Sequence, residues 1–127
     1  TDKRQFSSFA VETMPMKHSQ ESIAYRITDS DGKSLVYSGD TDTTENLVTL
    51  AAGADILICE SAMPDALKVP GHLTPSLAGD LAARARVKKL VLTHLYPECD
   101  QFDIADQCRR TYPGPLVIAE DLMRMEV

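Results

Sequence analysis

The sequence predicts an α+β fold with one mixed sheet and about three helices. The first 38 residues contain alternating segments that are typical of strands and end in a hairpin signal. After them, short apolar runs alternate with segments of helical spacing, which favours a sheet with helices on at least one face. A length of 127 residues, with 43% hydrophobic and 25% charged residues, fits one globular domain.

The N-terminal third of the chain is predicted to be extended. Residues 6–17 alternate imperfectly between apolar and polar side chains, whereas residues 23–27 alternate strictly, with three large side chains on one face. The sequence Asp-Ser-Asp-Gly-Lys at 29–33 is a strong turn signal, and a short strand at 35–37 follows it. Residues 22–38 are therefore predicted to form a β-hairpin.

Three helices are predicted, the first two from their N-terminal caps. The first is expected at residues 42–52, because Asp42 and Glu45 have the spacing of a capping box. The second begins where Thr74 and Pro75 suit the N-cap and the first turn, and its apolar residues form a single stripe. The third is expected at residues 103–110.

Each apolar run that is predicted to be a strand is followed by a polar residue able to do chemistry. The runs lie at 35–37, 55–59, 89–92 and 116–119, and a last short strand is predicted at 122–127. The residues that follow are Asp40, Glu60, His94 and the pair Glu120 and Asp121, while His18 follows the first extended segment. If the strands run in one direction, these side chains gather at one edge of the sheet, where ligands bind in open α/β folds.

Composition argues against several functional classes. No apolar run approaches the ~18–20 residues of a membrane span, and residues 1–26 do not resemble a signal or transit peptide. We therefore expect a cytoplasmic location and no membrane partner. A net charge of −6 disfavours broad binding along a nucleic-acid backbone, although metal ions can supply the positive charge of a nuclease. Three cysteines without C-x-x-C spacing argue against disulfides and a zinc ribbon.

The three histidines, His18, His72 and His94, each lie at a junction between predicted elements. Imidazoles and carboxylates such as Asp40 are a common ligand set for zinc and related metals. Ordinary roles are the alternatives, since His72 can be a loop residue and Asp40 a helix cap or a turn residue. The chain contains no sequence-local metal motif. The residues alone therefore predict a polar site, with a bound metal as one option.

Five short motifs, in order, resemble a known family. They are Lys17-His18 followed by Ile23-Ala24-Tyr25-Arg26-Ile27, Tyr37-Ser38-Gly39-Asp40-Thr41, Ile58-Cys59-Glu60, Gly71-His72-Leu73-Thr74 and Leu92-Thr93-His94. Over essentially the whole chain they resemble the C-terminal half of the metallo-β-lactamase superfamily, in its ribonuclease Z-like branch. The resemblance implies an αββα sandwich, of which residues 1–127 form one domain, the C-terminal half.

The resemblance also implies a role for each of these polar residues. His18 would bind a first metal ion, Asp40 would bridge two ions, and His94 would bind the second. His72 would protonate the leaving group, oriented by Glu60. Such an enzyme is a metal-dependent hydrolase, in which a metal-activated water attacks a phosphodiester or another ester. The implied cofactor is Zn²⁺, two ions per complete site, with Mn²⁺ or Fe as alternatives.

Two departures from the family bear on completeness and on substrate. The signature H-x-H-x-D-H, which supplies most of the metal ligands, is absent, so the chain alone is expected to be incomplete and inactive and to need a separate N-terminal half. Ribonuclease Z usually follows its last metal histidine with a small residue and an Arg-Tyr pair. Here Leu95-Tyr96-Pro97 follows His94, and the long tRNA-binding arm is missing. Nucleic acid is therefore a possible but not a favoured partner.

Two other functional interpretations also fit the sequence. The chain can be a non-catalytic α/β binding or regulatory domain, or a degenerate superfamily member that has lost catalysis. Half of a sandwich also leaves one sheet face partly uncovered. We expect that face to carry Val36, Ile56, Ile58, Val91 and Val117, and to be covered by the N-terminal half or by a second copy of the chain.

Overall fold

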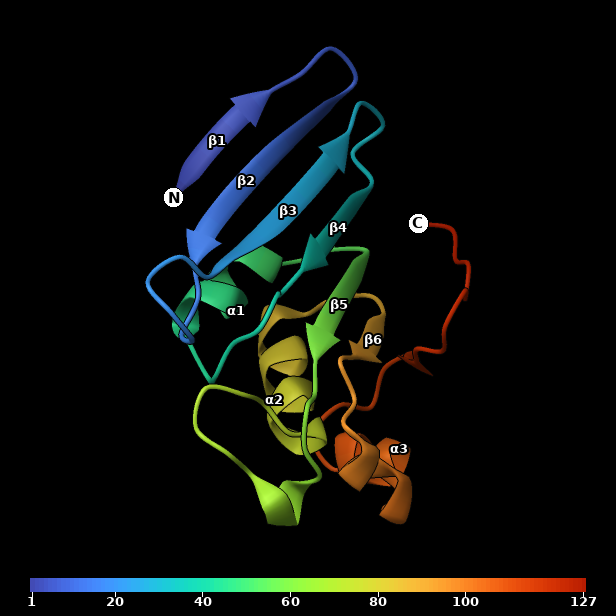
Figure 1. Cartoon of the computed structure of the whole chain (residues 1–127). Coiled ribbons are helices and arrows are strands. Elements are labelled where there is room, and N and C mark those ends of the chain that lie inside the picture. Colours follow the sequence, from blue (N-terminus) through green and yellow to red (C-terminus); the bar gives the residue numbers. More distant parts are fainter.

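The computed structural model describes residues 1–127 and contains one mixed sheet of seven strands, whose spatial order follows their order in the chain (Figure 1). Strands β1 to β4 are antiparallel neighbours, and β4 to β7 are parallel. The strands are β1 (Asp2–Gln5), β2 (Phe9–Pro15), β3 (Ile23–Asp29), β4 (Ser34–Tyr37), β5 (Ile56–Glu60), β6 (Leu90–Thr93) and β7 (Leu116–Ile118). The predicted mixed sheet and hairpin are confirmed.

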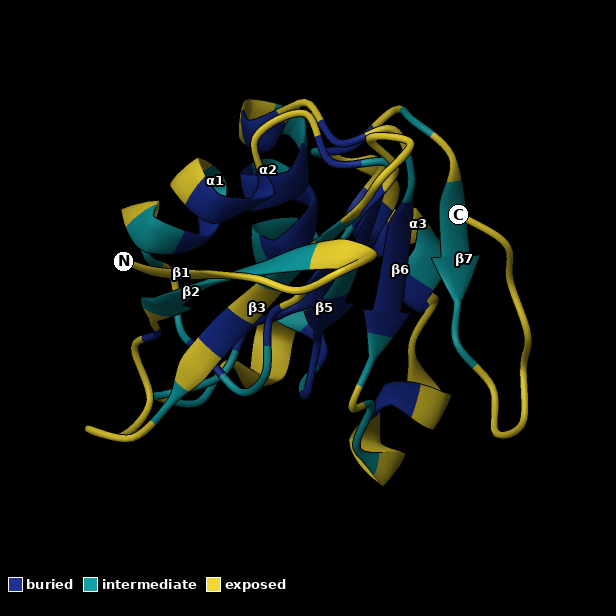
Figure 2. Cartoon of the chain, turned by 90° about the horizontal axis from the view of Figure 1, so that it is seen from above, coloured by how far each residue is buried: buried dark blue, intermediate teal, exposed yellow.

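Three helices connect the parallel strands and lie on one face of the sheet. They are α1 (Glu45–Ala51), α2 (Pro75–Ala85) and α3 (Ile104–Arg109), and two short 3₁₀ helices, η1 (Asp65–Leu67) and η2 (Pro97–Gln101), lie in the connections. Right-handed crossovers between successive strands place all three helices on the same side. There Val36, Leu57 and Leu90 pack with apolar residues of the helices in one buried cluster. Figure 2 shows α1 and α2 side by side, with buried residues turned toward the sheet.

The predicted helix starts are correct for two helices and wrong for one. Thr74 caps α2 by accepting a hydrogen bond from Leu77, and Asp103 caps α3 in the same way. The first helix begins at Glu45, with Thr44 as its N-cap, and not at Asp42. The carboxylate of Asp42 is used elsewhere, because it accepts a hydrogen bond from Gly71, 29 residues further along the chain.

The last predicted strand, at residues 122–127, does not form. A backbone hydrogen bond from Met123 to Glu120 closes a turn directly after β7, and the chain then leaves the edge of the sheet (Figure 1). Leu122 adopts a φ of +65° and is 98% exposed. Because this segment pairs with no strand, no inter-strand hydrogen bonds hold its apolar residues against the sheet.

The face of the sheet opposite the helices is apolar and partly uncovered. In the strand register, Tyr25, Tyr37, Ile58 and Val91 are partners in neighbouring strands and share this face. Exposure is greatest toward the hairpin, where Tyr25 is 41% and Tyr37 is 45% exposed, whereas Val91 is buried. The predicted open face is thus present. The assignment of Val36 to it is wrong, because Val36 pairs with Leu57 and points toward the helices.

Asp55, just before β5, fixes the start of the parallel part of the sheet. Its carboxylate accepts a hydrogen bond of 2.9 Å from the Ser34 backbone and lies 3.0 Å from the ammonium of Lys88. These contacts lower the pKa of Asp55 to about 2, with the Ser34 hydrogen bond as the larger cause. A carboxyl whose pKa is lower in the folded state stabilises the fold above its unfolded pKa, and this contribution disappears as the pH falls through the folded value.

We therefore expect Asp55→Asn to lower the free energy of unfolding at pH 7. The loss should shrink between pH 4 and pH 2, where wild-type Asp55 itself becomes protonated. Urea unfolding at pH 7 and at pH 2.5 measures both quantities. Asp31→Asn, at an exposed turn position, is the matched control. An equal loss at the two pH values would contradict this account of Asp55.

Candidate metal centre

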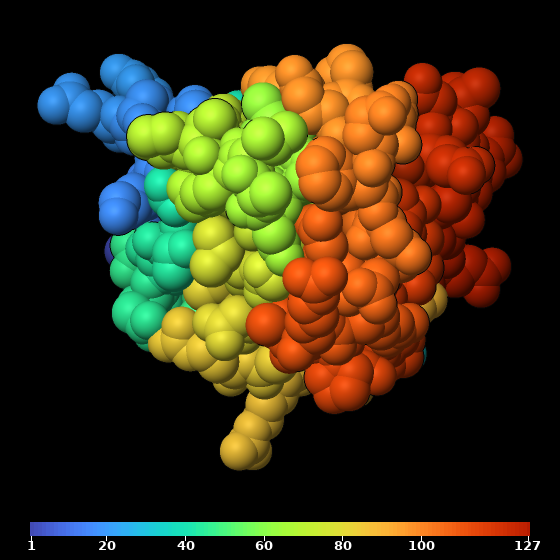
Figure 3. Space-filling view, turned by 90° about the horizontal axis from the view of Figure 1, so that it is seen from below, coloured from blue at the N-terminus to red at the C-terminus, as the bar shows by residue number.

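The ends of four strands meet at one edge of the sheet and position the candidate site. β2 runs in the same direction as β4, because each is antiparallel to β3, and β4, β5 and β6 are parallel. His18, Asp40 and His94 follow β2, β4 and β6, and Glu60 is the last residue of β5. Figure 3 views the molecule from this end, where the segment after β5 lies against the segment after β6. The predicted convergence of these residues is confirmed.

His18 is oriented by the loop that precedes α2. Its Nδ1–H donates to the carbonyl of Gly71 over 2.9 Å, which leaves the lone pair of Nε2 free. Nε2 lies 3.8 Å from one carboxylate oxygen of Asp40. Gly71 has a φ of +84°, and a Cβ there would lie 3.2 Å from Nδ1 of His18. Only glycine allows the loop to take this conformation at this distance without strain.

Asp40 lies between two histidines. Its Oδ2 is 3.8 Å from Nε2 of His18, and its Oδ1 is 3.5 Å from Nε2 of His94. The preceding Gly39 has a φ of +58°, which makes the tight turn after β4 that the sequence predicts. The alternative role of Asp40 as a helix cap is excluded, because Thr44 caps α1. Each carboxylate oxygen therefore faces a different imidazole.

His94 has an unusual backbone conformation. Its φ of +61° lies in the left-handed region, which few non-glycine residues adopt. The ring packs edge-on against Tyr96, with 5.1 Å between centroids, and its nitrogens make no hydrogen bond within the chain. The backbone turn, and not a hydrogen bond to Nδ1, therefore directs this side chain toward Asp40.

Glu60 is buried and binds four hydrogen-bond donors. Its carboxylate accepts from the backbone N–H groups of Thr41, Ala62 and Leu73 over 3.0–3.1 Å, and from Nδ1 of His72 over 2.8 Å. The side chain of Glu60 is 2% exposed. One carboxylate thus ties together the turn after β4, the end of β5 and the loop before α2. Because Nδ1 of His72 is the donor, Nε2 keeps a free lone pair.

Two further residues shape the site, and sequence analysis did not assign them to it. Asp42 accepts hydrogen bonds from Gly71 and from Lys68, and so holds the loop that carries His72. Burial alone would raise the pKa of Asp42, but hydrogen bonds from the Gly71 and Thr43 backbone and from Lys68 lower it overall. Tyr96 packs against the rings of both His72 and His94. Its position in the sequence, two residues after the predicted ligand His94, could have indicated that Tyr96 lies at the site.

The donor set fits a transition-metal ion. One ligand atom each from His18, Asp40 and His72 lies within 4.8 Å of the other two, and His94 faces the second oxygen of Asp40. Neutral imidazole and carboxylate are the ligands that zinc and related metals take in catalytic sites. The Nδ1–H groups of His18 and His72 are both held by oxygen atoms, the arrangement that usually orients metal-binding histidines.

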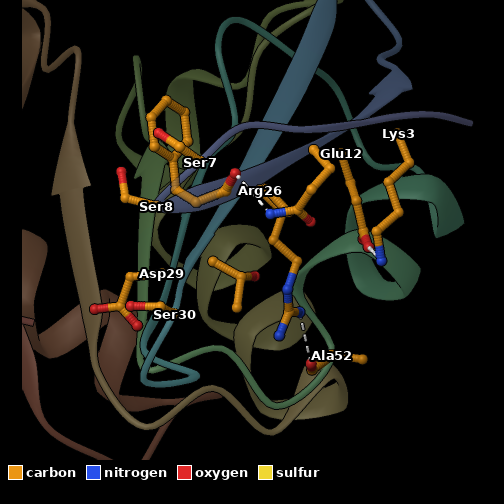
Figure 4. A pocket seen from close by; sticks show the side chains of 12 residues that line it. Lys3, Ser7, Ser8, Glu12, Arg26, Asp29, Ser30 and Ala52 are labelled. Carbon is orange, nitrogen blue, oxygen red and sulfur yellow. Dashed lines mark hydrogen bonds and ion pairs between the residues drawn. The ribbon is translucent and has the colours of Figure 1, made fainter.

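Two pockets are informative about what surrounds this centre. The larger, of about 610 Å³, lies on the helix side of β1 to β3, where Arg26 reaches the end of α1 (Figure 4). None of the candidate metal ligands lines it. A second pocket, of about 270 Å³, lies between His94 and the pair Glu120 and Asp121. The predicted position of these two acids near the site is therefore confirmed.

The basic cluster and the cysteines have structural roles. Arg84 pairs with Glu45, Lys88 pairs with Asp55, and Arg86 ends α2, so the basic residues at 84–89 lie at a helix end. All three cysteines are free and buried, and burial raises the pKa of each thiol.

None of the three helices has the length and apolar character needed to cross a membrane.

Comparison with known proteins identifies the family. A model described as a beta-lactamase superfamily domain matches residues 2–95. An uncharacterized protein of Mycobacterium leprae is 40% identical over 111 residues, which cover 84% of this chain and 39% of that protein. Ribonuclease Z of Archaeoglobus fulgidus is 35% identical over 76% of this chain and 33% of its own length. The chain therefore spans between a third and two fifths of these relatives.

Solved structures have the same fold. The metallo-beta-lactamase fold protein YhfI of Bacillus subtilis matches 94% of this chain and 50% of its own, with a TM-score of 0.83 and 24% identity. The short form of human tRNase Z matches 94% of this chain and 44% of its own, with a TM-score of 0.73 and 27% identity. These matches confirm the resemblance that the motifs predicted, and the chain belongs to the beta-lactamase superfamily.

Proposed function

We propose that this chain is the C-terminal half of a metal-dependent hydrolase that cleaves a phosphodiester or another ester. The observation that carries the proposal is Asp40, whose two oxygens face His18 and His94 at 3.8 Å and 3.5 Å. A carboxylate in that position is suited to bridge two ions. Two Zn²⁺ ions per complete site fit the donor set, with Mn²⁺ or Fe as alternatives.

Each residue has a distinct role in this proposal. His18, Asp40 and His94 hold the metal ions, which when bound supply a water that is a nucleophile near neutral pH. His72 donates a proton from Nε2 to the leaving group. Glu60 acts through His72, because its hydrogen bond to Nδ1 fixes the ring and stabilises the protonated imidazole. This chain alone is expected to be inactive, since it lacks the H-x-H-x-D-H ligands.

The partner in this proposal is a separate N-terminal half that covers the open sheet face. An apolar face of this kind, exposed at Tyr25 and Tyr37, usually has a partner. A homodimer through the same face is the alternative. A cytoplasmic location stays a prediction.

Tyr25→Asp together with Tyr37→Asp is expected to weaken association at least about 100-fold, because two charges would have to be desolvated in the interface. Leu67→Asp, at an equally exposed apolar side chain on η1, is the matched control. Sedimentation of the chain, alone and with the N-terminal half, measures both the hetero-complex and any homodimer. A chain that stays monomeric at high concentration and binds no N-terminal half would contradict the proposed partner.

The test of the proposed function is metal content and hydrolysis in the completed protein. We expect about two ions per complex and turnover of a phosphodiester such as bis(p-nitrophenyl) phosphate. Asp40→Ala should remove metal and lower kcat/KM at least about 1000-fold, because several kcal/mol of charge stabilisation are lost. Asp31→Ala, on the hairpin turn, should change neither. A complex without metal would instead favour a binding domain or a degenerate superfamily member.

The relatives and the net charge of the chain favour different substrate classes for the completed protein. Ribonucleases Z are among the relatives, which makes an RNA phosphodiester one candidate. The net charge of −6 and the missing arm disfavour a long nucleic acid and favour a small ester or a cyclic nucleotide. Comparison of kcat/KM for a short RNA and for a small diester distinguishes the two classes.

A further inference from the structure

We propose that this chain, without any partner, binds one divalent transition-metal ion through His18, Asp40 and His72. This ligand set differs from the set of His18, Asp40 and His94 proposed for the completed enzyme. In it, His72 is a metal ligand and not a proton donor. The inference does not depend on whether the completed protein is a hydrolase.

The separation of the ligand atoms supports a single ion. The three atoms lie within 4.8 Å of one another, and Nε2 of His18 is 3.8 Å from Oδ2 of Asp40. In a tetrahedral site with bonds of about 2.1 Å, two ligand atoms lie about 3.4 Å apart. A pair at the 4.8 Å bound therefore has to close by roughly 1.4 Å, which rotation of the partly exposed His18 and Asp40 side chains provides.

The hydrogen bonds of the two histidines favour the same set. Nδ1 of His18 is held by the Gly71 carbonyl and Nδ1 of His72 by the Glu60 carboxylate, so both rings present the Nε2 lone pair. The two rings already lie against each other, with 4.9 Å between their centroids. Little ordering is needed for His18 and His72 to bind a common ion.

His94 lacks the hydrogen bond and the burial that favour His72 as a ligand. No hydrogen bond holds its Nδ1, and its Nε2 faces Oδ1 of Asp40, whereas His18 faces Oδ2. The side chain of His94 is 37% exposed, compared with 13% for His72. In the isolated chain His94 therefore has more freedom to lose on binding an ion than His72 has.

Charge at the site also favours a dication. Asp40 makes no ion pair with any lysine or arginine, and the buried Glu60 receives only N–H groups. Two carboxylates therefore stand close to the three imidazoles without a fixed cation. A bound divalent ion supplies the missing positive charge.

A metal ion bound to His72 would compete with the role of this residue as an acid. While Nε2 of His72 is bound to the ion, that atom cannot donate a proton to a leaving group. In the completed protein, ligands from the N-terminal half would have to take the place of His72 before it could act as an acid.

Titration of the metal-free chain with Co²⁺, followed by visible absorption, and with Zn²⁺, followed by calorimetry, tests the ligand set. One ion per chain is expected. His72→Ala should weaken binding about 10–100-fold, whereas His94→Ala, a matched histidine at the same edge, should change it less than about threefold. Equal losses in both variants, a loss only in His94→Ala, or the absence of binding by the wild-type chain would overturn the proposal.

A second measurement uses only the wild-type chain and so does not depend on the folding of variants. Side-chain ¹⁵N spectra should show Zn²⁺ shifting Nε2 of His18 and His72, with His94 unchanged. A shift of His94 in place of His72 would overturn the proposed ligand set. Because no hydrolysis is measured, either outcome leaves the metal content and activity of the completed protein as a separate test.

Discussion

Replacing Glu60 by alanine is expected to lower the free energy of unfolding of this chain by about 3–5 kcal/mol. The substitution leaves the backbone N–H groups of Thr41, Ala62 and Leu73 without an acceptor in a buried region, and it frees the ring of His72. Each buried donor left unpaired costs about 1–3 kcal/mol, and part of this loss is recovered when water or a shifted loop reaches the donors. Urea unfolding at pH 7, followed by circular dichroism, measures the difference.

Two variants sharpen the test of Glu60. Glu60→Gln keeps one carbonyl oxygen but turns an amide NH₂ toward the same donors, so we expect a loss between zero and that of alanine. Glu21→Gln, at an exposed position without a side-chain partner, should stay within about 0.5 kcal/mol of wild type. If Glu60→Ala cost no more than this control, Glu60 would not hold the three loops together.

His72→Ala in the completed protein is expected to lower kcat by about 10²–10⁴-fold, the usual contribution of a positioned acid. The metal content should stay at about two ions, because the completed site has other ligands. The loss should depend on the leaving group. An alkoxide needs a proton in the transition state, whereas p-nitrophenolate leaves without one. Steady-state kinetics on an alkyl and a p-nitrophenyl diester measure this difference.

Tyr96→Phe is the control for His72→Ala, because it keeps the aromatic ring that packs against His72 and His94. It should leave the ratio between the two diesters unchanged. If His72→Ala lowered turnover of both diesters equally and also removed metal, His72 would be a permanent ligand. The single-ion set of the isolated chain would then persist in the completed enzyme.

The part of the site that depends on strand direction could be predicted from the sequence. Because parallel strands end at the same edge, Asp40, Glu60 and His94 had to come together once their strands were recognised. Thr74 was also readable as a cap, since a cap acts within three residues of itself. These are local or topological rules, and they need no knowledge of distant contacts.

Long-range contacts decided the features that could not be predicted. Asp42 has the spacing of a cap, but it bonds to Gly71, and no local rule indicates that partner. The four donors of Glu60 come from segments 19, 2, 13 and 12 residues away. In the four-residue strand β4, alternation does not fix which residues face the helices, and Val36 was therefore placed on the wrong side.

The left-handed backbone conformation of His94 lowers the stability of the fold at a position whose side chain is proposed to bind metal. An L-residue at a φ of +61° costs roughly 1–2 kcal/mol relative to glycine, which takes this conformation freely. His94→Gly should therefore give a more stable chain than wild type, and one without the imidazole that faces Asp40. Substitutions chosen for stability without regard to activity would include His94, together with Arg86 and Leu122, which also have a positive φ. At position 94, a gain in stability would therefore remove a proposed metal ligand.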